Sequence, residues 1–406
     1  MKNSLHLLVI FLSLMTTTNL LHAQWTETDG PDDDNITCFA VSGTNLFAGT
    51  SGMGVIRSTD NGASWKEVSQ GISDTPVNAL LMNGTNLFAG TSGDGVRLST
   101  NNGKTWSNIN TGLTDNFVES LAVKGSQIFA GTHSGGVFVS YDNGGEWKHL
   151  GLADLYVEAI AICGTQLYVG GDKGIFRSIN NGSTWSPRNS GLTNKQVTSF
   201  VVADTFLFTG TRGGGVFVST NNDARWTPMN NGLTNKNILS LAVSGSNLYA
   251  GTHGGGVFLS TDNGNSWTAI NTGLANMSIH ALAADSNNLF AGTSEGVWRR
   301  PTSELTTSIA EGGGTSDLST HYRLDQNFPN PFTQMTTLRF SLPRAEYVSM
   351  KIFNLQGEEV ANIVSENIPA GTFQVDWNAE ELPGGVYVCL LQAGSFSQTS
   401  KLLLLK

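Results

Sequence analysis

The sequence SLAVSGSNLYAGTHGGGVFLSTDNGNSWTAIN at residues 240–271 is one copy of a repeat that runs through most of the 406-residue chain. It contains four short runs that alternate apolar and polar residues, SLAVSG, NLYAGT, GVFLST and SWTAIN, separated by glycine-rich turns. Four short strands per unit are typical of one blade of a β-propeller. Strands this short cannot bury both faces alone, so neighbouring copies must supply the second layer of the core.

Two motifs mark the copies of this repeat. The first has the form LFAGT, with close variants, and begins at Leu46, Leu87, Ile128, Leu167, Leu207, Leu248 and Leu289. The second ends in a tryptophan, at Trp65, Trp106, Trp147, Trp185, Trp226 and Trp267. The last copy lacks the second motif, but the isolated segment QWTE at residues 24–27 has the same character. We expect this segment to complete the last blade and close the ring, so the sequence predicts an all-β chain with a seven-bladed β-propeller over residues 24–301.

The tryptophan motif reads SxDxGxxW and resembles the Asp-box, or bacterial neuraminidase repeat. Its most complete copies contribute Ser58, Asp60, Gly62, Trp65, Asp142, Trp147, Asp262, Gly264 and Trp267. In such a hairpin turn the Asp or Asn side chain accepts backbone N–H bonds, the glycine adopts a positive φ and the tryptophan packs beneath. A calcium site is the functional alternative, but one carboxylate per turn supplies too few oxygen ligands. We therefore predict that the boxes are structural and that the protein uses no metal or cofactor.

Composition narrows the class of protein further. The chain has 48 glycines, only 13% charged residues, and 22 Lys plus Arg against 32 Asp plus Glu, a formal net charge of -10. Many glycines with little charge indicate tight turns rather than long helices. The acidic balance argues against a nucleic-acid or anionic-membrane partner. Because Cys38, Cys163 and Cys389 form no CxxC pair or Cys/His cluster, neither a zinc site nor a disulfide is expected.

Residues 1–23 have the features of a signal peptide. Lys2 supplies a positive charge, LLVIFLSLM at residues 7–15 is an apolar core too short to span a bilayer, and Ala23 ends the segment with a small residue. A buried N-terminal strand is the alternative. We predict a secreted protein whose remaining chain is soluble.

The C-terminal part of the chain has a different pattern from the repeats. Residues 302–320 lack apolar periodicity and are predicted to be a flexible linker, whereas residues 321–406 alternate as in a small antiparallel, immunoglobulin-like β-sandwich. The motifs QNFPNPF (326–332), VSMKIFNLQGEEV (348–360) and LPGGVYVCLL (382–391) resemble the type A C-terminal sorting domain of the type IX (Por) secretion system. The resemblance implies export by that machinery, in Bacteroidetes-like bacteria, to the cell surface or the medium. An ordinary immunoglobulin-like carbohydrate-binding module is the alternative.

A propeller ligand usually binds on the face that carries the turns before each first strand and after each second strand. Alignment of the copies at these turns yields the candidate ligand-binding residues Phe117, Tyr156, Asp74, Asp115, Lys195, Arg212, Lys236 and His253. Aspartates and asparagines at such positions can instead simply cap turns. The aromatic pair is the stronger indication, because turns do not require aromatic residues. His133 and His253 occupy equivalent positions in blades 3 and 6, where the channel would keep them too far apart to bind a metal ion jointly, so each is expected to be a lone polar residue of the rim.

Two families of enzymes also have Asp-box propellers. The resemblance to sialidases implies a triad of arginines whose first member is missing here, because no arginine precedes Arg57. The resemblance to xyloglucan hydrolases implies two aspartates across a cleft between two propellers, whereas this chain has one. On a single rim Asp74 and Asp115 are the candidate acid and base, with nothing in their short loops to raise the pKa of one selectively. A third resemblance, to single-propeller photosystem II assembly and stability factors, implies protein binding without catalysis.

These features together predict a secreted or cell-surface protein that acts as a monomer. Its propeller is expected to bind a protein or glycan without a catalytic residue, and a glycoside hydrolase of the Asp-box type is the alternative. The expected partners are the type IX machinery, through the C-terminal domain, and one extracellular ligand that the sequence does not specify.

Overall fold

The computed structural model describes residues 24–31, 34–203, 206–219, 225–285, 287–302, 322–327, 329–368, 371–394 and 396–406. The predicted signal peptide lies outside these residues, and so does the predicted linker after Thr302. The chain divides into two compact units, Met1–Glu311 and Gly312–Lys406. In the described ranges every regular element is a β-strand, and we find no helix that is long and apolar enough to cross a membrane.

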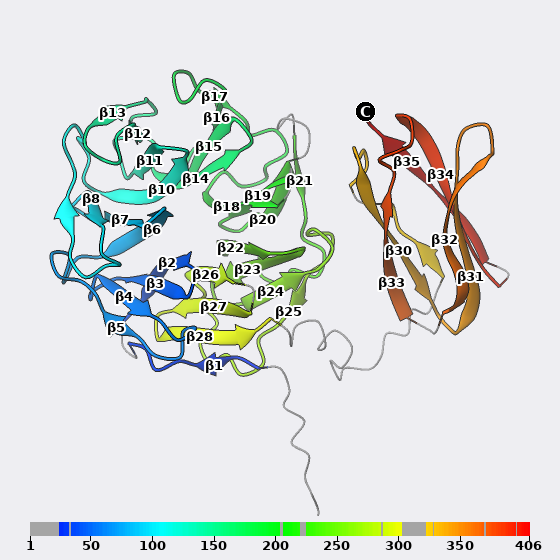
Figure 1. Cartoon of the computed structure of the whole chain (residues 1–406), viewed down its shortest axis with the longest axis horizontal. Coiled ribbons are helices and arrows are strands. Elements are labelled where there is room, and N and C mark those ends of the chain that lie inside the picture. Colours follow the sequence, from blue (N-terminus) through cyan, green and yellow to red (C-terminus); the bar gives the residue numbers. More distant parts are fainter. Residues whose placement is uncertain are drawn as a thin grey trace, which may run out of the picture. The chain divides into compact units, whose positions relative to one another are not determined.

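Seven four-stranded sheets make up the described part of the first unit and correspond to seven blades (Figure 1). Blade 1 consists of β2 (Ile36–Ser42), β3 (Asn45–Thr50), β4 (Val55–Ser58) and β5 (Lys66–Glu67); blade 2 of β6 (Val77–Asn83), β7 (Asn86–Thr91), β8 (Val96–Ser99) and β9 (Ser107–Asn108); blade 3 of β10 (Val118–Lys124), β11 (Gln127–Thr132), β12 (Val137–Ser140) and β13 (Trp147–His149); and blade 4 of β14 (Val157–Cys163), β15 (Gln166–Gly171), β16 (Gly174–Ser178) and β17 (Ser186–Pro187). Blade 5 consists of β18 (Val197–Ala203), β19 (Phe206–Thr211), β20 (Gly215–Ser219) and β21 (Trp226–Pro228); blade 6 of β22 (Ile238–Ser244), β23 (Asn247–Thr252), β24 (Gly256–Ser260) and β25 (Thr268–Ala269); and blade 7 of β26 (Ala281–Ala284), β27 (Asn288–Thr293), β28 (Gly296–Pro301) and β1 (Thr26–Glu27).

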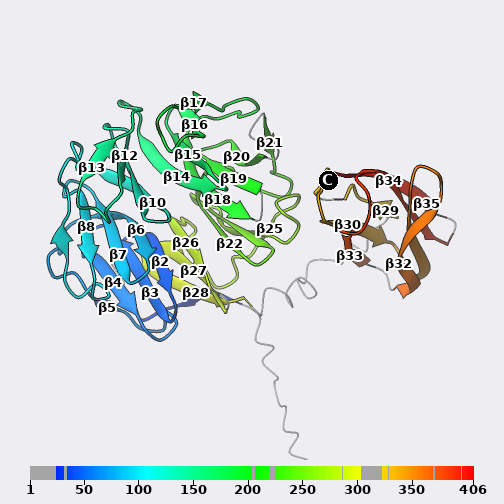
Figure 2. The ribbon, with the colours of Figure 1, turned by 45° about the horizontal axis from the view of Figure 1, so that its top comes forward.

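The seventh blade is assembled from both ends of the repeat region. Strand β1 pairs antiparallel with β28, so that Thr26 lies opposite Arg299 and Glu27 opposite Trp298. The innermost strands surround the axis of the ring in the order β2, β6, β10, β14, β18, β22 and β26, each in contact with the next, and β26 contacts β2 (Figure 1 and Figure 2). The predicted closure of the ring by the N-terminal segment is confirmed.

A tryptophan in the outer part of each blade fastens that blade to the one before it. The indole Nε1 of Trp106 donates to a carbonyl oxygen of blade 1 at 2.8 Å. The same bond recurs at Trp147, Trp185, Trp226 and Trp267. Trp25 makes it too, to Ile270 at 2.6 Å, and is therefore the seventh tryptophan of the series. In blade 1 the indole of Trp65 instead donates to the hydroxyl oxygen of Thr28 at 3.1 Å.

Each Asp-box that the structure describes in full forms a hairpin turn that is closed by its own side chains. In the first box Ser58 Oγ donates to Asp60 Oδ1 at 2.7 Å and accepts the Gly62 N–H at 2.8 Å, while Asp60 Oδ1 accepts the Ser64 N–H at 2.9 Å. These hydrogen bonds, those from Ser64 above all, hold the pKa of Asp60 well below its usual value. Gly62 has a φ of 75°, and a Cβ there would lie 2.5 Å from Phe290 of blade 7, so this position requires glycine. The serine bonds recur in the boxes of blades 3 and 6, whereas residues 220–224 of the fifth box lie outside the described residues.

Apolar side chains of adjacent blades interlock to form the core. One cluster contains Phe88 and Val96 of blade 2 together with Val118 and Phe138 of blade 3, all fully buried. Val118 is the first residue of β10, and a Cβ at Gly90 of blade 2 would lie 2.6 Å from its side chain. The glycine of the LFAGT motif therefore admits the first side chain of the next blade, which positions the start of every innermost strand.

The second unit is a sandwich of two antiparallel sheets. One sheet has the order β29 (Arg323–Leu324), β30 (Met335–Leu342) and β33 (Gly371–Asn378), and the other has the order β32 (Glu359–Ile368), β31 (Glu346–Phe353), β34 (Gly385–Ala393) and β35 (Phe396–Leu404). A single buried cluster joins them, with Leu338 and Phe340 from the first sheet and Met350, Ile352 and Leu391 from the second. The predicted all-β fold class, a seven-bladed propeller followed by a small sandwich, is confirmed.

Candidate functional site

The innermost strands of blades 1 to 6 begin with a β-bulge, which displaces their second residue from the regular pairing. In β10 the register shifts between Val118 and Ser120, and in β14 it shifts between Val157 and Ala159. The extra residues at the bulges of blades 1 to 6 are Thr37, Asn78, Glu119, Glu158, Thr198 and Leu239. Because a bulge re-aims the side chain of its extra residue, blades 2 to 4 present an amide and two carboxylates at one face of the ring.

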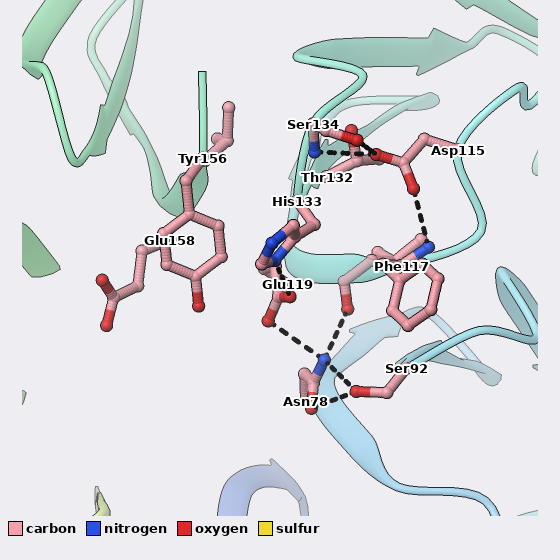
Figure 3. A network of polar contacts seen from close by, with 12 residues as sticks. Asn78, Ser92, Asp115, Phe117, Glu119, Thr132, His133, Ser134, Tyr156 and Glu158 are labelled. Atoms are coloured by element: carbon pink, nitrogen blue, oxygen red, sulfur yellow. Dashed lines mark hydrogen bonds and ion pairs between the residues drawn. The ribbon is translucent and has the colours of Figure 1, made fainter. Parts of the chain in front are cut away.

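Glu119 lies at the centre of a hydrogen-bond network that joins blades 2 and 3 (Figure 3). Asn78 Nδ2 donates to Glu119 Oε2 at 3.0 Å, and Glu119 Oε1 lies 3.3 Å from His133 Nδ1. Asn78 Nδ2 also contacts Ser92 Oγ at 2.9 Å and the carbonyl oxygen of Val118 at 3.2 Å. The side chain of Glu119 is only 15% exposed, so these contacts stabilise a carboxylate that burial by itself disfavours.

Glu158 occupies the equivalent position in blade 4 and has its partner in blade 5. Nη2 of Arg212 donates to Glu158 Oε1 at 2.6 Å, and the side chains of Glu158 and Arg212 are 19% and 44% exposed. Arg212 follows β19, the second strand of blade 5, so the ion pair crosses the boundary between two blades. With one partner half exposed, such a pair orients both side chains more than it stabilises the fold.

Three rings form a row beside these carboxylates. The His133 ring lies between Phe117 and Tyr156, with ring centroids 6.3 Å from Phe117 and 4.9 Å from Tyr156 (Figure 3). Phe117 is 50% exposed and the side chain of His133 is 62% exposed. Phe117 and His133 belong to blade 3 and Tyr156 to the loop before β14 of blade 4, so the row also spans a blade boundary.

The electrostatic environment of the site is negative. Burial raises the pKa of the Glu119 and Glu158 carboxyl groups, although His133 opposes the rise at Glu119 and Arg212 opposes it at Glu158. The charge of Glu158 adds to the rise in the pKa of Glu119. Burial, and then the charges of both glutamates, also raise the pKa of the Tyr156 hydroxyl. The arrangement can therefore stack a ligand on aromatic rings and accept hydrogen bonds from it.

Among the predicted site residues, Phe117, Tyr156 and Arg212 belong to the group around Glu119 and Glu158. Asp115 instead stabilises the turn beside this group. Oδ1 of Asp115 accepts the N–H of Phe117 at 3.0 Å, and its Oδ2 accepts those of Ser134 at 2.8 Å and Gly135 at 2.7 Å. Burial raises the pKa of Asp115, but these hydrogen bonds outweigh it and the net shift is downward. Asp115 therefore caps the turn that positions Phe117, which is the alternative that the sequence left open.

The other predicted residues lie in turns of other blades. Asp74 has a φ of 60° in the turn before β6. The side chains of Lys195 and Lys236 are exposed in the turns before β18 and β22. Nδ1 of His253 lies 3.0 Å from a serine hydroxyl in the turn before blade 7. No contact among the described residues brings these four side chains to the two glutamates.

The sequence pattern did not single out Asn78, Glu119 or Glu158. Each is the second residue of an innermost strand, in VNALLMN, VESLAVK and VEAIAIC, where blades 1, 5 and 6 have Thr or Leu. A polar residue that interrupts an apolar strand in only some copies is the signal that identifies them. The expectation that His133 is a lone polar residue is wrong, because its ring contacts two aromatic side chains and a carboxylate.

Within the described ranges, no three His, Cys, Asp or Glu side chains are grouped so that they could hold a metal ion.

Comparison with protein families identifies both units. Residues 326–405 match the secretion system C-terminal sorting domain, and residues 188–341 match the DUF6242 beta propeller domain. This chain is a β-propeller protein with a type IX sorting domain. The propeller match extends beyond β28, which ends at Pro301, into residues that the structure places in the sandwich. The predicted sorting domain is confirmed, and it implies export to the cell surface or the extracellular space.

Solved structures share the propeller fold. The structure of "YCF48 bound to D1 peptide" matches with a TM-score of 0.56 and 15% identity, over 70% of this chain and 96% of that one. PorZ, a surface component of the type-IX secretion system of Porphyromonas gingivalis, matches with a TM-score of 0.54 and 17% identity, over 94% of this chain and 61% of its own. The GH74 enzyme of Niastella koreensis matches with a TM-score of 0.51 and 16% identity, over 66% of this chain and 43% of its own. Identities this low show the fold alone, and no curated protein sequence matches the chain significantly.

Proposed function

We propose that this exported propeller is a non-catalytic binding protein whose ligand docks where the innermost strands of blades 2 to 5 begin. The observation that carries the proposal is the row formed by the exposed rings of Phe117 and His133 and the half-buried ring of Tyr156, beside the partly buried carboxylates of Glu119 and Glu158. Aromatic faces combined with a few oriented polar groups are the usual composition of a protein's ligand site.

The fold itself does not need the aromatic residues of this row. The positions equivalent to Phe117 and Tyr156 in the other blades hold Asn35, Pro76, Gln196, Asn237 and Ser278. Those blades form the same four-stranded sheets. Because packing does not require a half-exposed phenylalanine at this place, ligand binding is the better explanation for it.

The ligand class that we propose is a polypeptide or a glycan. The YCF48 structure with the same fold contains a bound peptide, which supports the use of such a ring as a peptide-binding platform. A glycan would use the same surface through stacking on the rings and hydrogen bonds to the carboxylates. The outermost strand of each described blade is only two or three residues long and so offers little edge for pairing with a second copy, which supports a monomer as the binding species.

The test is a screen of peptide and glycan arrays with purified protein that contains both units, followed by the variants Tyr156→Ala and Phe117→Ala. Each is expected to weaken binding at least about tenfold, as truncation of a central interface aromatic does. The matched control is Tyr141→Ala, because Tyr141 is also 50% exposed but lies in the Asp-box turn at the other end of blade 3. Blank arrays, or equal losses in all three variants, would overturn the proposal.

A second candidate function, a glycoside hydrolase, is favoured by one specific observation. A general acid in such an enzyme must have a raised pKa so that it is protonated at the working pH. Burial raises the pKa of both Glu119 and Glu158, whereas that of Asp115 is lowered, so Asp115 does not suit the role of acid that the sequence suggested. If the protein is a hydrolase, the two glutamates are therefore its acid and base.

Hydrolysis of soluble polysaccharides, measured as reducing ends, distinguishes the two candidates. Turnover that Glu119→Gln or Glu158→Gln abolishes, and that Asp115→Asn leaves intact, would establish the hydrolase. Ligand binding without turnover in the unaltered protein is the expected result.

A further inference from the structure

The charges that meet at the start of blades 3 and 4 do not balance. Glu119 and Glu158 each contribute a carboxylate, whereas the permanent cation in contact with them is Arg212. His133 is the other basic group in contact, at Oε1 of Glu119. Asp172 accepts a backbone N–H of the blade 4 loop at 3.2 Å and Lys173 donates to a carbonyl oxygen of the same loop, so these two neighbours add one charge of each sign. With a neutral histidine the cluster therefore has an excess of negative charge.

One oxygen of this cluster is available to a ligand beside an aromatic face. Arg212 binds Oε1 of Glu158, and no donor among the described residues reaches Oε2. The Tyr156 ring lies between Glu158 and His133, and its hydroxyl faces Glu119 (Figure 3). A cation above this ring would meet a π face and a carboxylate oxygen together, and both attract it.

We propose that Tyr156, Glu119 and Glu158 form a site for the ammonium or guanidinium group of a lysine or arginine in an extracellular polypeptide. This inference rests on the proposed binding function and names the chemistry of its ligand. Two carboxylates repel an anionic ligand group, and a neutral sugar leaves their excess charge uncompensated. A polypeptide fits better than a small amine, because the exposed rings of Phe117 and His133 extend the surface to the residues that flank the basic side chain.

The first experiment compares two copies of one random-sequence peptide library. One copy contains free lysine and arginine, and the other contains Nε-acetyl-lysine and citrulline in their place, which removes the charge and little else. Peptides that the protein binds in the first copy are expected to bind about tenfold or more weakly in the second. Their affinity should also fall with added salt, because part of the attraction is between exposed charges.

Three variants then test whether the preference for charged peptides arises at this site. The double variant Glu119→Gln with Glu158→Gln is expected to lose the preference for the charged library, whereas Glu67→Gln on the outermost strand of blade 1 keeps it. Arg212→Gln removes the cation that competes for Glu158 and is expected to tighten binding of the charged peptides by about threefold or more. A gain of affinity is a result that a damaged fold does not produce.

The outcomes separate this inference from the proposed function. Binding that depends on Tyr156 but is equal for both libraries would overturn the cation site and leave the binding function standing. Binding of Nα-acetyl-lysine amide as tight as that of any peptide would overturn the polypeptide as ligand. Blank peptide and glycan arrays would overturn both.

Discussion

The Asp-box turns and the opposite face of the ring both present carboxylates, but the two environments act on these groups in opposite directions. In blade 3 the box follows the end of β12, whereas Glu119 stands at the start of β10 on the other face. Hydrogen bonds from Ser140 and from the Glu146 N–H lower the pKa of the box residue Asp142. Burial and a neighbouring carboxylate raise the pKa of Glu119.

The contrast separates residues that the fold requires from residues that the fold tolerates. The box position holds Asp in blades 1, 3 and 6 and Asn in blades 2 and 4, and in each of these its side-chain oxygen accepts an N–H from within its own turn. Glu119 and Glu158 occur in two blades only, and their partners come from other turns and other blades. A repeat protein thus places its specific chemistry where a copy departs from its neighbours.

The largest expected effect of a substitution concerns the box region. Trp147 is 2% exposed, and its indole donates to a carbonyl oxygen of blade 2 at 2.7 Å, so Trp147→Ala removes a large buried side chain at a blade interface. We expect a loss of about 3–5 kcal/mol in the free energy of unfolding. Calorimetry of the propeller transition measures it. Trp147→Phe is the control that keeps much of the packing, and an alanine variant as stable as the unaltered protein would contradict the structural role.

A smaller loss is expected when the serine of the same box is removed. Ser140 Oγ is buried, donates to Asp142 Oδ1 at 2.7 Å and accepts the Gly144 N–H at 2.7 Å. Ser140→Ala leaves that buried N–H without its acceptor, which costs roughly 1–3 kcal/mol. Ser92→Ala on the binding face, where the hydroxyl is less buried, should cost less in denaturant unfolding. A larger loss of stability for Ser92→Ala than for Ser140→Ala would contradict the structural role of the box serine.

At the binding face the expected change in stability depends on pH. Because the folded-state pKa of Glu119 is raised, its contribution to stability is present below the unfolded value and is lost as the pH rises through the folded one. Glu119→Gln does not titrate, so it should gain stability relative to the unaltered protein between about pH 4 and about pH 7. Chemical unfolding at both pH values measures the difference. A Glu119→Gln variant whose stability relative to the unaltered protein is lower at the higher pH would contradict the raised pKa of Glu119.

The smallest effect is expected for Asp60→Asn in the first box. Asn101 occupies the same position in blade 2, and its Oδ1 accepts the N–H of Thr105 at 3.0 Å as an aspartate would. The change in unfolding free energy near neutral pH should stay within about 0.5 kcal/mol. Since the folded pKa of Asp60 is lowered, any contribution of its charge is present above the usual value and fades as the pH falls through the folded one. Thermal unfolding across this range tests the sign.

Much of the fold could be read from the sequence because it depends on local, repeated rules. Turn residues, alternating strands and the tryptophan of each box specify one blade at a time, and Trp25 marks the strand that completes the seventh. The motifs of the sorting domain were equally informative. Of the site, the aromatic pair Phe117 and Tyr156 was recognisable, since no turn requires an aromatic residue.

Glu119 and Glu158 could not be predicted as site residues from the sequence, for a physical reason. In the sequence they look like ordinary polar positions of half-buried strands, and neither their burial nor their partners are local properties. Asn78 and Glu119 are 41 positions apart, and Glu158 and Arg212 are 54 apart. Only the stacking of the blades brings these groups together.

The order of amino acids thus accounts for the propeller, its closure and the tail that directs export, because each follows from interactions within or between adjacent repeats. The character of the binding face follows from the assembled ring. Desolvation and Coulomb interactions depend on distances across blade boundaries, and those distances exist only once the blades are packed.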